Sequence, residues 1–175
     1  MNRTVSSPKR LSGTLSPPGD KSISHRALML ASLVNGRSEL RNLSSADDVV
    51  STISCLKSCG LKYHRASNSV IVNGGNFVDP NQPLDCGNSG TTMRLLLGLL
   101  SGQGINATLI GDDSLSKRPM KRITDPLRLM GANTSSSEEG TLPIRIEPVD
   151  CLKSIKYSLP VASAQVKSCL LFAGL

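Results

Sequence analysis

Lysine, serine and arginine side chains gather at the start of one predicted helix, in the stretch Asp20–Arg26. This stretch follows the helix-breaking run Pro17-Pro18-Gly19 and leads into an apolar run, residues 27–31. The first backbone N–H groups of a helix lack partners within it, and the helix dipole is positive there, so such a start favours an anion. Lys21 adds a point charge, and Arg26 adds a planar fork suited to phosphate or carboxylate. An ordinary helix cap with solvated charges explains this stretch alone about equally well.

Two similar starts follow at a spacing of about 70 residues, which is typical of internal repeats. Residues 88–94 (NSGTTMR) lead into an apolar run, and so do residues 163–167 (SAQVK). Gly90 would let a ligand approach the backbone, although it could equally be a turn glycine. If the repeated units pack around a pseudo-three-fold axis with their helices parallel, the three starts point at one region.

The elements expected between these starts repeat as well: each unit reads helix, strand, helix and strand pair, with no strand before its first helix. The first unit is expected to contain helices at 22–34 and from 47 to Gly60, and strands at 38–43, 61–65 and 69–72. The second is expected to contain a helix after residue 90, strands at 105–110, 132–136 and 142–146, and a helix at 119–130. The third copy stops after one helix at Leu175, so the chain reads as truncated, unless this helix simply caps the fold. A further strand is expected at 10–15.

Composition limits the function classes. With 175 residues, 38% of them hydrophobic and 19% charged, the chain fits one globular domain with a real core and is marginal for two. Aromatic residues make up only 2%, which argues against stacking on nucleic-acid bases. The net charge of +7 comes from lysines and arginines that occur singly or in pairs beside glycine, serine and threonine. That distribution suits small phosphorylated ligands better than a duplex.

The five cysteines include no C-x-x-C pair and have almost no histidine nearby, so we expect no metal site and interpret the cysteines as buried hydrophobes or spectators. No apolar stretch resembles a signal peptide or approaches the ~18 residues of a membrane span. A reduced cytoplasmic or plastid-stroma-like compartment is the default expectation.

Other polar residues near the three starts have competing interpretations. Arg118 stands just before a helix start and could face the same region, or it could belong to a solvated basic turn. The role of Lys167 is left open. We interpret seven other residues as structural or solvated: His25, His64, Asp47, Asp48, Lys117, Lys121 and Arg122.

Four blocks in this order resemble 5-enolpyruvylshikimate-3-phosphate (EPSP) synthase, also called 3-phosphoshikimate 1-carboxyvinyltransferase. The blocks are residues 20–26 (DKSISHR), 87–94 (GNSGTTMR), 117–120 (KRPM) and 162–168 (ASAQVKS). The resemblance spans nearly the whole chain. It implies an α/β fold made of repeated βαβαββ units, which is the inside-out barrel fold of the enolpyruvyl transferases. This chain would contain only part of that fold. Residues 1–17 would belong to another, mostly missing domain, and residues 18–175 to a domain with two repeats and the start of a third.

The resemblance also implies an activity. The family transfers the enolpyruvyl group of phosphoenolpyruvate to the 5-hydroxyl of shikimate 3-phosphate and releases phosphate, in aromatic amino acid biosynthesis. It needs no metal or organic cofactor, and glyphosate inhibits it at the phosphoenolpyruvate site. The expected partners are these small molecules, with no nucleic acid and no membrane. A full-length protein is expected to be a cytoplasmic monomer. The acids for proton transfer are expected in the missing C-terminal part, so we expect this chain to be inactive unless a C-terminal chain complements it.

Position by position, the resemblance assigns a role to each matching residue. Lys21 is the implied catalytic residue, because it would contact both substrates and stabilise the leaving phosphate. The implied shikimate 3-phosphate ligands are Lys21, Ser22, Arg26, Ser163, Ala164 and Gln165. The implied phosphoenolpyruvate ligands are Lys21, Gly90, Arg118 and Gln165.

Three alternatives compete with this interpretation. A non-catalytic protein that binds phosphorylated metabolites would keep the anion sites without the chemistry. The related UDP-N-acetylglucosamine enolpyruvyl transferase shares the fold, but it lacks the KSISHR-type block and carries a reactive cysteine. A nucleic-acid-binding module is suggested only by the net charge.

Overall fold

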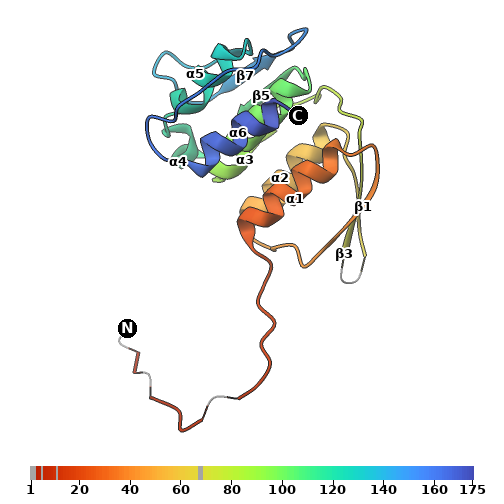
Figure 1. Ribbon diagram of the computed structural model, residues 1–175, viewed down its shortest axis with the longest axis vertical. Coiled ribbons are helices and arrows are strands. Elements are labelled where there is room, and N and C mark those ends of the chain that lie inside the picture. Colours follow the sequence, from red (N-terminus) through yellow and green to blue (C-terminus); the bar gives the residue numbers. More distant parts are fainter. Residues whose placement is uncertain (1–2, 5, 11, 67–68) are drawn as a thin grey trace.

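The computed structural model describes residues 3–4, 6–10, 12–66 and 69–175. Three helices begin at the three predicted starts: α1 (Lys21–Leu33), α3 (Gly90–Gly102) and α6 (Ala164–Ala173). They run in the same direction, with their first residues at the lower left of the body in Figure 1. Helix α3 contacts both α1 and α6. The predicted convergence of the helix starts therefore has a structural basis.

The first unit follows α1 with a three-stranded sheet and a second helix. Its remaining elements are β1 (Gly36–Arg41), α2 (Asp47–Ser58), β2 (Lys62–Arg65) and β3 (Ser69–Gly74). The sheet is antiparallel in the order β1-β3-β2, with Leu40 opposite Val70 and Tyr63 opposite Val72. The expected hairpin therefore forms, while residues 67 and 68 at its turn lie outside the described part of the chain.

The second unit repeats this arrangement around α3. Its other elements are β4 (Leu84–Asp85), β5 (Ala107–Ile110), α4 (Asp113–Ser116), α5 (Lys121–Leu129), β6 (Asn133–Ser135) and β7 (Ile144–Glu147). The order β5-β7-β6 matches β1-β3-β2, and α5 occupies the position of α2 in the sequence of elements. The predicted repeat is confirmed. The expectation of no strand before the first helix is wrong for this unit, because β4 precedes α3 and pairs in parallel with β5.

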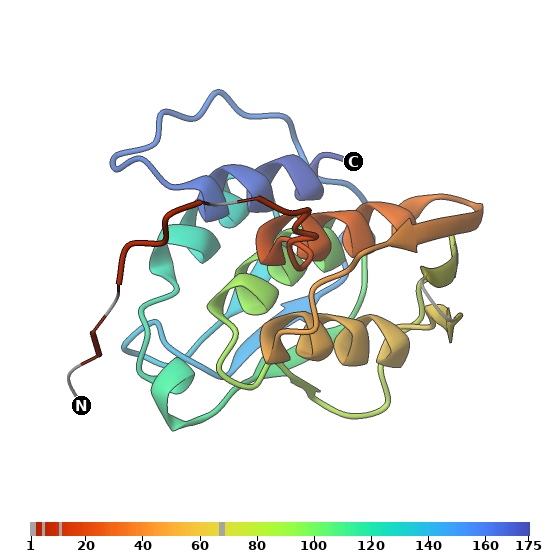
Figure 2. The same ribbon diagram turned by 90° about the horizontal axis from the view of Figure 1, so that it is seen from below.

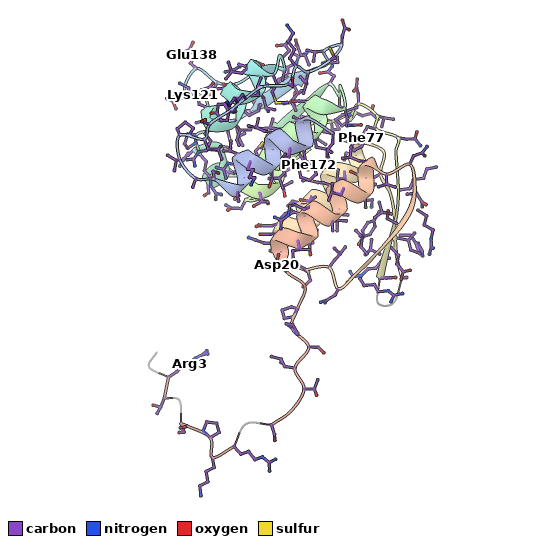
Figure 3. The ribbon with its side chains drawn as sticks, viewed as in Figure 1. Arg3, Asp20, Phe77, Lys121, Glu138 and Phe172 are labelled. Atoms are coloured by element: carbon purple, nitrogen blue, oxygen red, sulfur yellow. The ribbon has the colours of Figure 1, made fainter. Side chains whose placement is uncertain are left out.

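Two other expectations need correction. Residues 10 and 12–15 form no strand, since a strand requires a partner and this exposed tail pairs with none within the described residues; residue 11 lies outside them. The tail leaves the body at Asp20 (Figure 3) and lies nearest the viewer when the molecule is seen from below (Figure 2). Helix α5 begins at Lys121 rather than at 119, because the backbone N–H of Met120 donates to the carbonyl of Gly140 (2.9 Å) and ends the preceding turn.

Helix α3 forms the centre of the core because it is apolar on almost every face. Residues 95–100 are all buried, as expected for a helix surrounded by other elements. It contacts α1, α2, α5, α6 and β7. The position of α3 is therefore fixed from several sides, and its first turn is held in a defined place.

Two glycines allow α6 to approach α3 closely. A Cβ atom at Gly98 would lie 2.0 Å from the carbonyl oxygen of Cys169, and one at Gly102 would lie 2.8 Å from that of Ala173. These glycines are four residues apart and so lie on one face of α3, which forms a flat surface for the backbone of α6. The α3–α6 contact therefore depends on the absence of side chains.

We predict that Gly98→Ala destabilises the protein by about 2 kcal/mol, because the new methyl group would overlap backbone atoms that cannot move independently. Urea denaturation monitored by circular dichroism measures this change. Gly174→Ala is the matched control, because a Cβ there meets nothing closer than 3.7 Å. Equal stabilities of the two variants would contradict close packing at Gly98.

Candidate anion site

The three first helices begin with the same capping interaction. In each, the side chain before the helix accepts a hydrogen bond from the backbone N–H of the third helical residue. The pairs are Asp20 Oδ1 with Ile23 (2.6 Å), Ser89 Oγ with Thr92 (3.1 Å) and Ser163 Oγ with Val166 (3.3 Å). The caps satisfy the third N–H group of each helix and leave the first two for another acceptor.

The backbone N–H groups left over belong to residues 21–22, 90–91 and 164–165. Within the described residues none of these six groups has a hydrogen-bond acceptor. Unpaired N–H groups at the positive end of a helix form a ready anion-binding position. These six residues include five of those that the family resemblance singles out, namely Lys21, Ser22, Gly90, Ala164 and Gln165.

Two guanidinium groups lie over the first residue of α3, and a third lies close enough for its charge to act on one of them. A Cβ at Gly90 would stand 2.7 Å from Nη1 of Arg94 and 3.2 Å from Nη1 of Arg118, so both groups face the same point above the backbone. Burial lowers the pKa of Arg94, and the charges of Arg122 and Arg118 lower it further. None of the three has a carboxylate within 4.0 Å among the described residues. We call these residues, Arg94, Arg118 and Arg122, the arginine cluster.

Gln165 connects α6 to this cluster. Its Oε1 accepts a hydrogen bond from Nη1 of Arg94 (2.8 Å), and its Nε2 donates to Oγ1 of Thr91 (3.0 Å). The buried Nε of Arg94 has no partner in the described part of the chain. A buried donor of a charged group is costly to leave unpaired, so the contact of Arg94 with Gln165 is the one that orients this guanidinium.

Arg118 is held from the loop before α3 and from α4. Its Nη2 donates to Oδ1 of Asn88 (2.7 Å) and to Oγ of Ser114 (3.3 Å). Asn88 in turn donates from Nδ2 to Asp112 (2.6 Å), and this hydrogen bond lowers the pKa of the Asp112 carboxyl. Neutral oxygens thus orient the Arg118 guanidinium and leave its charge available.

Lys21 reaches the same region through Asp48. Its Nζ lies 2.6 Å from Oδ2 of Asp48, in the first turn of α2, and the lysine side chain is half exposed. The hydroxyl of Thr92 in α3 donates to the backbone carbonyl of Asp48 (3.0 Å). Contacts therefore run from Lys21 in α1 through α2 to the start of α3.

The structure brings together some predicted site residues more closely than others. Gly90, Arg118 and Gln165 surround one point, and Lys21 joins them through Asp48 and Thr92. Ser22 and Arg26 lie one turn apart on the exposed side of α1 and make no side-chain hydrogen bond within the described residues. Ser163 is the cap of α6 and Ala164 its first residue.

Sequence reasoning missed the positions of two arginines. Arg94 was part of a recognised motif, yet only the fold shows that it turns back over its own helix start. Arg122 was expected to be a solvated residue, and although it is exposed, its charge acts on Arg94. Its neighbour Lys121 instead lies over Gly140, beside the loop that carries Glu138 (Figure 3).

One cavity in the described part of the chain adjoins the arginine cluster at Arg122. This cavity, of about 390 Å³, is lined by Arg122, Ser163 and apolar residues of the loop before α6. Another, of about 440 Å³, lies between α2 and the β1-β3-β2 sheet, and its wall combines the apolar Leu40 and Ile53 with the polar Asn42 and Arg65.

The cysteines and acids of the described residues offer no metal site, since no group of three or more potential ligands lies together there. Cys55, Cys59, Cys86 and Cys169 are buried, as expected, whereas Cys151 is exposed. Burial raises the pKa of Cys59 and of Cys169 to about 12, so these thiols are unreactive. No helix in the described residues has the length and apolarity to cross a membrane.

The fold and the arrangement of cations define a class: a repeated α/β protein whose helix starts gather positive charge on one face. A profile of the EPSP synthase family, 3-phosphoshikimate 1-carboxyvinyltransferase, matches residues 5–175. The chain therefore belongs to the EPSP synthase family.

Similar proteins agree with this assignment. The chain is 49% identical to the 3-phosphoshikimate 1-carboxyvinyltransferase of Caldicellulosiruptor saccharolyticus and 48% identical to that of Salinibacter ruber; the matches cover 100% of this chain and 41% and 42% of those proteins. The solved EPSP synthase of Acinetobacter baumannii superposes with a TM-score of 0.89 at 42% identity, over 93% of this chain and 38% of that one. The chain thus spans about two fifths of the length of these relatives.

His25 offers a test of the buried contacts beneath the site. It is 0% exposed, and burial lowers its pKa from 6.5 to about 4, with Lys21 and Arg26 lowering it and Asp48 raising it. The unfolded state therefore binds more protons between pH 4 and 6.5, and stability is lost as pH falls through this window.

We predict that the free energy of unfolding falls by on the order of 2 kcal/mol between pH 6.5 and 4 because of His25. Urea denaturation at a series of pH values measures this loss. Subtracting the curve of the His25→Gln variant isolates the contribution of the histidine from that of the carboxylates. Parallel curves for the two proteins would contradict a depressed His25 pKa.

Proposed function

We propose that the chain provides one half of the substrate site of a 3-phosphoshikimate 1-carboxyvinyltransferase. The observation that carries the proposal is the arginine cluster at the start of α3, which has unpaired backbone N–H groups and no carboxylate within 4.0 Å among the described residues. Like charges held so close repel one another unless an anion lies between them. Both substrates of this reaction are phosphorylated anions, and the family membership supports the same chemistry.

In the proposed site phosphoenolpyruvate binds at Gly90, Arg118 and Gln165, and shikimate 3-phosphate binds at Ser22, Arg26 and the start of α6, Ser163–Gln165. Lys21 lies between them and contacts both. The 5-hydroxyl of shikimate 3-phosphate loses its proton as its oxygen bonds to C2 of phosphoenolpyruvate, and a proton adds to C3. Loss of a proton from C3 and cleavage of the bond between C2 and the phosphate oxygen then restore the C2–C3 double bond and release phosphate. The cations hold the two anions side by side and stabilise charge on the leaving phosphate.

We further propose that residues 18–175 form an incomplete domain, that residues 1–17 belong to another domain, and that the protein works as a cytoplasmic monomer at full length. The proton-transfer acids are then supplied from outside this chain. Because glyphosate inhibits the family at the phosphoenolpyruvate site, we propose that it binds at the same residues here.

We predict that the purified chain binds shikimate 3-phosphate or phosphoenolpyruvate but releases no phosphate from the two together. Calorimetry measures binding and a phosphate assay measures turnover. Addition of the remaining C-terminal part of a relative should produce phosphate release, and Lys21→Ala should reduce it at least ~100-fold, whereas Lys57→Ala on the exposed side of α2 should not.

Each outcome of this test has a defined meaning. Turnover by the chain alone would contradict the division of the site between two parts. Absence of binding up to about 1 mM of either ligand would contradict the anion site itself. Binding that persists with no turnover after complementation would favour a protein that holds phosphorylated metabolites without catalysis.

We predict that Gly90→Ala weakens inhibition of the complemented enzyme by glyphosate at least ~10-fold, because a methyl group there would meet Nη1 of Arg94 at 2.7 Å and of Arg118 at 3.2 Å. The concentration of glyphosate that halves phosphate release measures the effect. Gly174→Ala is the control, since its methyl group has room. Equal inhibition of Gly90→Ala and the unaltered protein would refute the assignment of this position.

A further inference from the structure

A buried series of hydrogen bonds joins the N-terminal halves of three helices beneath the anion site. Nδ1 of His25 in α1 lies 2.7 Å from Oγ1 of Thr52 in α2, which lies 2.7 Å from Oγ1 of Thr92 in α3. Thr92 donates to the carbonyl of Asp48 (3.0 Å). The side chains of His25, Thr52 and Thr92 are all 0% exposed. Thr52 also lies 3.4 Å from the carbonyl of Asp48 in its own helix, and Thr92 lies 2.8 Å from Oγ of its cap Ser89, but the contacts above cross from one helix to the next.

The unpaired ring nitrogen of His25 sets the direction of these hydrogen bonds. Nε2 is buried and has no partner within the described residues. A proton on Nε2 would be a buried donor without an acceptor, so the neutral ring carries its proton on Nδ1. His25 then donates to Thr52, Thr52 donates to Thr92, and the Thr92 hydroxyl proton lies within reach of the Asp48 carbonyl (3.0 Å) and of Oγ of Ser89 (2.8 Å).

The series ends at the residue that holds Lys21. Asp48 accepts from Thr92 at its backbone carbonyl and from Lys21 at its carboxylate, with Nζ 2.6 Å from Oδ2. An exposed ion pair contributes little by itself, because both long side chains lose freedom when they pair. Here the backbone of the aspartate that pairs with Lys21 is tied to α3 by the Thr92 hydroxyl, so the carboxylate extends from a fixed point and the lysine is held at lower entropic cost.

We infer that His25, Thr52 and Thr92 are positioning residues that hold Lys21 in place through Asp48. Only the identity of the anion that Lys21 binds rests on the proposed function. The positioning of Lys21 is argued from contacts within the chain. The three residues contact no ligand in this arrangement, since they are buried beneath the helix starts. Their effect on anion binding passes through the Lys21 ammonium group.

The chain provides a control for general destabilisation. Thr124 in α5 is also a buried threonine, 1% exposed, but its hydroxyl bonds to the carbonyl of Met120 (3.5 Å) in its own turn. Valine has nearly the shape of threonine, so replacing Thr124 or Thr92 by valine removes one buried hydroxyl group and little else. Only the change at Thr92 removes a hydrogen bond that joins helices to Asp48.

The test uses the 175-residue chain labelled with ¹⁵N, and follows the Lys21 ammonium signal by NMR, assigned from the Lys21→Arg variant. Thr92→Val should speed hydrogen exchange of the ammonium group at least ~3-fold, whereas Thr92→Ser and Thr124→Val should leave it unchanged. Should Thr92→Val fail to fold, Thr52→Val breaks the same series one step earlier. Unchanged exchange in a folded Thr92→Val or Thr52→Val protein would overturn the inference.

Titration with shikimate 3-phosphate separates this inference from the proposed function. If Thr92→Val changes the Lys21 signal and weakens shikimate 3-phosphate binding at least ~3-fold, both stand. If the signal changes although the unaltered chain binds no shikimate 3-phosphate, the positioning stands and the proposed function fails. If Thr124→Val alters the Lys21 signal as much as Thr92→Val does, the effect is general destabilisation and the inference fails.

Discussion

Repulsion among like charges is the constraint on which this site depends. Arg94, Arg118 and Arg122 lie close enough for each neighbour to lower the pKa of Arg94, and part of the Arg94 guanidinium is buried. A folded protein tolerates such an arrangement where hydrogen bonds orient the groups and a ligand supplies the missing negative charge. Gln165 and Asn88 provide the orientation through neutral oxygens. Because no carboxylate lies within 4.0 Å of these groups among the described residues, we propose that a phosphorylated anion supplies the negative charge.

The repeat explains how one short chain gathers this charge. In both units the strand after the first helix, β1 or β5, pairs with the last strand of a hairpin, β3 or β7. Helix α3 lies between neighbours on several sides. The helices α1, α3 and α6 run in the same direction (Figure 1), so their dipoles add on one face instead of cancelling. Close packing at Gly98 brings α6 near enough for Gln165 to contact Arg94.

Local patterns in the sequence predicted the elements that local forces determine. The apolar spacing in α1 and α2, the acids in the first turn of α2 and the glycines after helices placed most boundaries within a few residues. The two-residue strand β4 and the four-residue helix α4 were not predicted, because such short elements exist only through their neighbours. The contact of Thr92 with Asp48 joins residues 44 positions apart, and nothing in either segment alone indicates it.

NMR titration of the ¹⁵N-labelled chain with phosphoenolpyruvate tests the central claim most directly. The account predicts saturable shifts of the backbone amides of residues 90–91 and of the guanidinium signals of Arg94 and Arg118, with an affinity that falls as salt is added. Shifts that instead cluster at the cavity between α2 and the β1-β3-β2 sheet, or the absence of any saturable shift, would contradict it.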